Sequence, residues 1–198
     1  MSIMIDFINS SLIFGILMLT IARVQSNINT VLYQNQHNVT TQTNAVELAR
    51  QLEFDLAKVG YHVVSGQHIL LADSTMIRYF ADVDNNLVLS QVQYSIGDIS
   101  QAGFTENSRD FPLFRTVGAN TVQQNFGVTF FKFTYYDSVY SKIPTPITTA
   151  VNLEKIRAIN VSFRVESPDP VYTDYDTSWA AVTWEKMILP RNLYNLNY

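Results

Sequence analysis

The clearest pattern in the chain is an apolar N-terminal stretch that continues into a helical repeat. Residues 3–22 contain one charge, Asp6. Twenty helical residues span about 30 Å, close to the thickness of a bilayer's hydrocarbon layer. A buried core helix is the alternative, but the length favours a membrane span. The absence of Lys and Arg before Arg23 predicts a retained segment rather than a cleaved signal. The residues expected to form the membrane anchor are Leu12, Ile13, Phe14, Gly15, Ile16, Leu17, Met18, Leu19 and Ile21.

The same helical periodicity continues well beyond the apolar stretch. Apolar residues recur mostly at spacings of 3, 4 or 7, there is no Gly between Gly15 and Gly60, and the first Pro is Pro112. These features predict one helix from about residue 3 to Val59, on the order of 85 Å long at 1.5 Å per residue. Gly60 is the expected stop. The residues expected to pack against other helices are Val24, Ile28, Val31, Leu32 and Val39.

The middle of this predicted helix has an unusual polar composition. Residues 24–46 carry no Asp, Glu, Lys or Arg, and thirteen of the twenty residues from 25 to 44 are Asn, Gln or Thr. Neutral amides suit a helix packed among other helices, where amides pair and charges are costly. The same composition fits a weakly helical polar linker, because Asn and Thr are mediocre helix formers. The sequence favours neither explanation.

Beyond this segment the pattern becomes amphipathic and then changes to strands. Residues 45–61 carry one apolar stripe, which predicts a helix that covers a sheet. The stripe consists of Val46, Ala49, Leu52, Leu56 and Val59. Runs of β-branched and aromatic residues then predict strands at 69–71, 76–80, 87–95, 113–116, 127–136, 156–166 and 180–189. Loops are expected at 97–109, 138–149 and 168–178. The predicted fold is α+β: a long, partly transmembrane N-terminal helix (residues 1–60) packed on the antiparallel sheet of a β-rich head (residues 61–198).

The composition narrows the classes of function. A net charge of −4 and a pI near 5.3 argue against a nucleic-acid binder. The chain has no Cys and only three scattered His, so neither a disulfide framework nor a His/Cys metal cluster is expected. No nucleophile-elbow, phosphate-loop or metalloprotease motif occurs, so we expect neither an enzyme nor a cofactor. The one candidate metal site is a D-x-D-x-N run for calcium, Asp82, Asp84 and Asn86, for which an Asx-type hairpin turn is the alternative.

Four local sequences occur along the chain in an order typical of one family. They are LARQLEFDLAKVGY at residues 48–61, GVTFFKFTYYD at 127–137, IRAINVSFRVE at 156–166 and LPRNL at 189–193. In this order and spacing they resemble the type IV pilin superfamily, in the group of the minor pilin W and the type II secretion pseudopilin J. The resemblance covers most of the chain and implies a pilin-like fold.

The resemblance also implies how such a chain is used. It implies a structural subunit of a pilus-like filament or secretion pseudopilus, anchored by a single pass in the inner membrane before assembly. After assembly, the expected partners are copies of itself or other pilins in a periplasmic or extracellular filament. Family members carry an acidic residue at the fifth position of the mature chain, which Asp6 occupies if Met1 is removed. By this resemblance Asp6 sets axial register by pairing with a neighbour's terminal amine.

Two other classes of protein remain open. One is a membrane-tethered extracytoplasmic binding module that forms no filament. The other is a viral or phage structural protein with a long helix and a β head.

Overall fold

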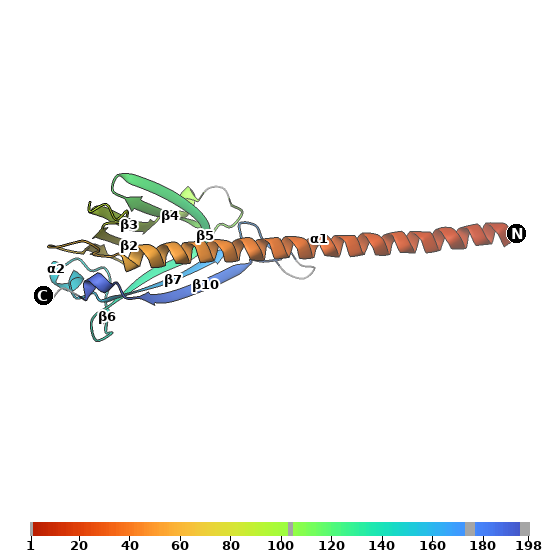
Figure 1. The fold of residues 1–198 in the computed structure, drawn as a ribbon. Helices are drawn as coiled ribbons and strands as arrows, with labels where there is room; N and C mark the ends of the chain where they lie inside the picture. Colours follow the sequence, from red (N-terminus) through yellow and green to blue (C-terminus); the bar gives the residue numbers. More distant parts are fainter. Residues whose placement is uncertain (1, 103–104, 173–176, 195–198) are drawn as a thin grey trace.

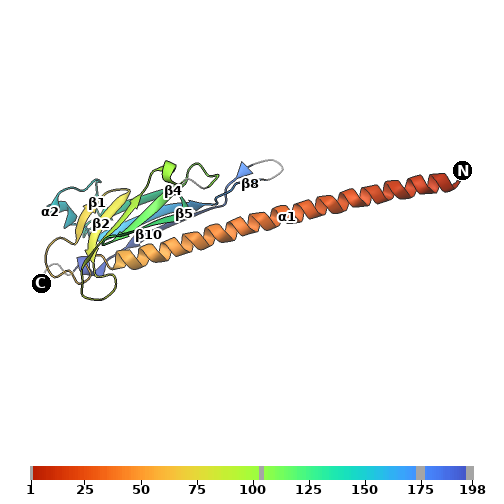
Figure 2. The ribbon, with the colours of Figure 1, turned by 90° about the horizontal axis from the view of Figure 1, so that it is seen from above.

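The long helix dominates the computed structural model, which describes residues 2–102, 105–172 and 177–194. Helix α1 (Ser2–Ala57) runs without interruption for 56 residues, about 84 Å at 1.5 Å per residue. Its N-terminal part projects far beyond the rest of the molecule, and its C-terminal part lies along a β-rich head (Figures 1 and 2). The predicted helix is confirmed, and it ends within two residues of the predicted Val59.

Gly60 marks the point where the chain leaves the helix for the head. Its φ is +75°, and a Cβ at this position would lie 2.3 Å from Cδ2 of His68. Both the backbone conformation and the close approach of His68 therefore require glycine. The Gly60 N–H donates to the carbonyl of Phe80 at 2.9 Å, which ties the helix end to strand β2 (Met76–Ala81).

The head is a curled antiparallel sheet with a few short additions. Its strands follow the order β1-β2-β3-β4-β5-β7-β10, β6 pairs with β5, and β8 pairs with β9 in a separate ribbon. The other strands are β1 (Ile69–Ala72), β3 (Ser90–Ile96), β4 (Phe111–Val117), β5 (Asn120–Tyr136), β6 (Lys142–Ile143), β7 (Ala158–Glu166), β8 (Val171–Tyr172), β9 (Thr177–Ser178) and β10 (Ala181–Ile188). The short helices are η1 (Ile99–Gln101), α2 (Ala150–Leu153) and η2 (Arg191–Leu193). The predicted α+β fold is confirmed.

The predicted strands are found, with differences at their ends. Strand β5 begins at Asn120 rather than at residue 127, because its polar first residues pair with β4 in a hairpin that starts at Val117. Strand β3 begins at Ser90 rather than at residue 87, because Leu87 has a φ of +65° and belongs to the preceding turn. The expected loop at 168–178 contains β8 and β9, and its residues 173–176 lie outside the described residues.

One face of the C-terminal part of α1 is buried against the sheet. Its buried side chains are at most 6% exposed and comprise Ala45, Leu48, Ala49, Leu52 and Leu56, followed by Val59 after the helix. They share a core with the stacked and edge-on rings of Phe131, Phe133 and Phe163. The predicted stripe is wrong at Val46, which is 49% exposed. Val46 lies on a flank of the helix, and Ala45 and Leu48 occupy the buried face instead.

Candidate assembly surface on the projecting helix

The projecting half of α1 leaves its apolar side chains uncovered. Between residues 3 and 21, every large apolar side chain is at least 52% exposed. By length and composition, α1 is the one helix in the described residues that is suited to cross a bilayer. The residues predicted to form the membrane anchor all lie on this segment.

Four hydroxyl groups of α1 are satisfied within the helix itself. Ser11 donates to the carbonyl three residues earlier at 2.9 Å, and Thr20 to the carbonyl four residues earlier at 2.8 Å. Thr30 and Thr43 donate in the same way at 3.1 and 2.8 Å. These bonds remove the need for water, so the hydroxyls are compatible with surroundings of lipid or of other helices.

Asp6 is the single charge of the apolar segment. Its side chain is exposed, and it makes no hydrogen bond or ion pair with any other described residue. A carboxylate in a hydrocarbon layer or in a packed helix bundle is costly unless a cation pairs with it. A partner for Asp6 in such surroundings therefore has to come from another molecule.

A narrow apolar flank continues along α1 past the membrane-length segment. The residues predicted to pack against other helices are between 52% and 63% exposed, namely Val24, Ile28, Val31, Leu32 and Val39. Val46 extends this set, since spacings of 3, 4, 7 or 8 keep residues on one side of a helix. We call the six residues the apolar flank. It lies beyond the roughly 20 residues that a bilayer requires.

The amide-rich segment of α1 is helical throughout. One side of it faces the ribbon of β8 and β9. Between them lies a recess of about 240 Å³ lined by Thr30, Tyr33, Gln34, His37, Pro170 and Val171. The residues of the apolar flank do not line this recess and stay exposed.

A buried ionic network fixes the C-terminal part of α1 to the sheet. The carboxylate of Asp55, 2% exposed, accepts two hydrogen bonds from Arg115, with Nε–Oδ2 at 2.6 Å and Nη2–Oδ1 at 3.2 Å. The Tyr94 hydroxyl donates to Oδ2 at 2.5 Å. The Tyr79 hydroxyl donates to the backbone carbonyl of Asp55 at 3.0 Å. The helix and three strands of the sheet are thereby joined at one residue, Asp55.

The electrostatics of this network keep its donors protonated. Burial, followed by the negative charge of Asp55, raises the pKa of both Tyr79 and Tyr94. The hydrogen bond to Asp55 is the largest of the effects that raise the pKa of Arg115. The sequence pattern alone misses this network, because its members are far apart in the chain. The one local signal is that Asp55 follows Leu52 by three residues and so shares its buried face.

The residues predicted as a calcium site form a tight turn. Oδ1 of Asp82 accepts the N–H of Asn86 at 3.1 Å, while Oδ2 accepts the N–H of Leu87 at 2.9 Å and lies 2.8 Å from Nδ1 of His62. Asp84 is exposed. No group of three or more His, Asp and Glu side chains in the described residues is arranged to hold a metal ion. The geometry favours the Asx-turn alternative, because donors already occupy both oxygens of Asp82.

These donors also set the acidity of Asp82. Burial alone would raise the pKa of its carboxyl group. The hydrogen bonds from His62 and from the backbone of Leu87 and Asn86 outweigh burial and hold this pKa below its ordinary value.

No protein-family model matches the chain, and no curated protein sequence matches it.

Proposed function

We propose that the chain is a subunit of a type IV pilin-like filament or secretion pseudopilus and that it assembles through α1. The observation that carries this proposal is the apolar flank. Anchoring in a bilayer uses about 20 residues, which accounts for residues 3–22. It does not account for uncovered apolar side chains that continue as far as Val46. Packing between the helices of neighbouring subunits buries these side chains.

The polar groups of α1 support the same proposal. The back-bonded hydroxyls of α1 need no outside partner. The neutral amides between residues 25 and 44 hydrogen-bond across a helix interface without the desolvation cost of a charge. The helix is therefore suited both to the inner membrane and to a bundle of similar helices. A pilin-like subunit occupies the first before assembly and the second in the filament.

The remaining features have defined roles under this proposal. The Asp55 network makes the helix and the head one rigid body, so helix packing in the centre also determines where the heads lie outside. Asp6 finds its cation in the terminal amine of a neighbouring subunit and so sets the axial register. The partners are copies of this chain or other pilin-like chains.

Negative-stain electron microscopy of the purified native assembly tests the proposal. Thin filaments with helical order are the expected result. Monodisperse single particles in detergent would contradict the proposal and favour a membrane-tethered binding module. Closed shells or virus-like particles would favour a viral structural protein.

A further inference from the structure

The ribbon of β8 and β9 lies beside the middle of α1, with two recesses between them (Figure 2). One is the recess of about 240 Å³ that Tyr33 and His37 line, and the other has a volume of about 370 Å³. Gln34 and Val171 line both recesses, so the two adjoin. We call the two recesses together the ribbon groove.

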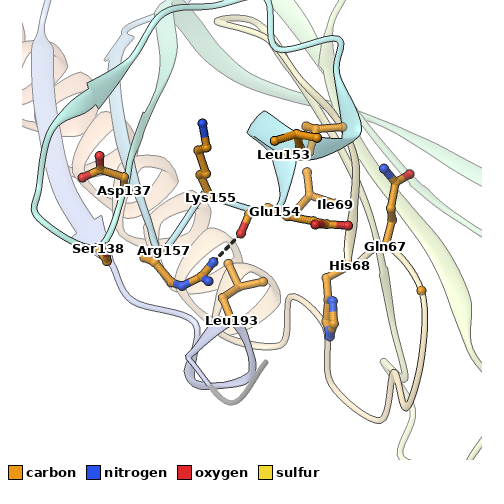
Figure 3. Close-up of a pocket in the computed structure, with 12 residues that line it drawn as sticks. Gln67, His68, Ile69, Asp137, Ser138, Leu153, Glu154, Lys155, Arg157 and Leu193 are labelled. Atoms are coloured by element: carbon orange, nitrogen blue, oxygen red, sulfur yellow. Dashed lines mark hydrogen bonds between the residues drawn. The ribbon is translucent and has the colours of Figure 1, made fainter. Parts of the chain in front are cut away.

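The ribbon groove is uncharged along the residues that the structure describes. None of the lining residues there is Asp, Glu, Lys or Arg. The larger recess of about 630 Å³ at the far end of the head differs, because Asp137, Glu154, Lys155 and Arg157 line it (Figure 3). An ionic ligand in the ribbon groove would lose its hydration without finding a counter-charge, so the groove favours a neutral ligand.

Two amide side chains of α1 line the groove without partners of their own. Neither the Gln34 nor the Asn38 side chain forms a hydrogen bond with another described residue. The two are one helical turn apart, which places their Cβ atoms about 5–6 Å from each other on one side of the helix. Each amide group offers both donors and an acceptor. This pair suits a ligand that carries several neighbouring hydroxyl groups.

An aromatic ring lines each recess. Tyr33 belongs to the smaller recess and is 66% exposed, while the half-buried Trp179 belongs to the larger one. Cζ of Arg109 lies 5.8 Å from the centre of the Trp179 ring, and Arg109 in turn pairs with Glu166 at 2.6 Å. These contacts support the position of the Trp179 ring before any ligand binds. Tyr and Trp rings present apolar faces, which can cover the C–H groups of a sugar.

The groove lies on the side of α1 that is opposite the apolar flank. Nine residues make about two and a half turns of a helix. Tyr33 follows Val24 by nine residues, and His37 follows Ile28 by nine residues. Packing through the apolar flank and binding in the ribbon groove therefore use different sides of α1.

We propose that the ribbon groove binds a neutral oligosaccharide. The amides of Gln34 and Asn38 hydrogen-bond its hydroxyl groups, and the rings of Tyr33 and Trp179 cover the C–H faces of its sugar units. The lining residues of α1 from Thr30 to Asn38 span about 12 Å along the helix, so the groove accommodates more than one sugar unit. The proposal does not depend on filament formation, because every residue in it belongs to one chain.

A glycan array probed with the fluorescently labelled full chain tests this binding. The chain is kept in a detergent without a sugar head group, so that the detergent does not compete for the groove. We expect retention on neutral oligosaccharides and retention weaker by about tenfold on their sulfated or uronic-acid counterparts. Retention on no neutral oligosaccharide would overturn the proposal, as would equal or stronger retention on the acidic counterparts.

Matched variants test the assigned contacts by isothermal titration with the neutral oligosaccharide that the array retains best. Gln34→Ala removes the amide shared by both recesses, and Tyr33→Ala removes one ring. Each should weaken binding by about three- to tenfold. Gln36→Ala removes an exposed amide that lines neither recess, and Tyr33→Phe keeps the ring, so both should retain the wild-type affinity.

The variants also show which result contradicts the assignment. Wild-type affinity in both Gln34→Ala and Tyr33→Ala would overturn it, as would an equal loss in Gln34→Ala and Gln36→Ala. None of the three substituted positions is buried, so the variants should fold like the wild type. The comparison of neutral with acidic oligosaccharides uses the wild-type chain and needs no variant.

Discussion

Replacing Asp55 by Ala removes the acceptor at the centre of the network beneath α1. Arg115, whose side chain is 24% exposed, then loses both of its carboxylate hydrogen bonds. The fully buried Tyr94 loses the acceptor for its hydroxyl group. Removing one partner of a buried ion pair typically costs about 3–5 kcal/mol, because the other charge stays buried without compensation. We expect Asp55→Ala to lower the Tm of the head by about 10 °C, since 1 kcal/mol corresponds to about 2–4 °C for a domain of this size.

Tryptophan fluorescence during heating of the full chain in detergent micelles measures this loss, because both Trp residues lie in the head. Glu53→Gln is the matched control. Glu53 pairs with Lys186 at 2.7 Å, but their side chains are 38% and 50% exposed. An exposed pair of this kind contributes about 0–1 kcal/mol.

The double variant Asp55→Leu/Arg115→Met completes the test. It replaces both charges by apolar groups and should recover most of the lost stability, because no unpaired charge remains buried. A Tm for Asp55→Ala within about 2 °C of the wild type would refute the reasoning. A double variant no more stable than the single variant would also refute it.

The turn at Asp82 should open in acid. The pKa of Asp82 is lowered in the folded state, so its contribution to stability is present above the unfolded value of 3.8 and is lost as the pH falls through the folded value. NMR shifts of the turn amides should follow that titration, and an unchanged spectrum would contradict it. Gly127→Ala should lower the Tm more than Gly118→Ala does. Both glycines have φ above +20°, but a Cβ on Gly127 would lie 2.4 Å from the carbonyl oxygen of Glu166, whereas a Cβ on Gly118 would have no atom within 4 Å. Equal losses, each about 1–2 kcal/mol from the backbone alone, would argue against a steric effect. Asp6→Ala should abolish or disorder filaments seen by microscopy, and normal filaments would disprove the register hypothesis.

The helix and most strands were predictable because their patterns are local. A run of helical spacings with no Gly between Gly15 and Gly60 and no Pro before Pro112 predicts α1, and alternating β-branched and aromatic residues predict β5 and β7. The error at Val46 has a physical reason. The C-terminal part of α1 carries two neighbouring apolar faces, one toward the sheet and one on the flank. Periodicity alone cannot distinguish which face a residue between them belongs to.

The buried ionic network was not predictable because it depends on distant residues. Asp55 and Arg115 are 60 positions apart in the chain. The D-x-D-x-N run fits both a calcium loop and an Asx turn, and only the positions of the backbone donors around Asp82 favour the turn.

Burial of the apolar flank by neighbouring subunits is the central claim, and thiol labelling tests it most directly. The chain has no Cys, so Val39→Cys introduces a single thiol on the flank. Val139→Cys is the control, because Val139 is 77% exposed on the head. We predict that a hydrophilic maleimide labels Val39→Cys much more slowly in the native assembly than in detergent-dispersed monomers, while the Val139→Cys rate stays the same. An equal labelling rate for Val39→Cys in both states would contradict assembly through α1.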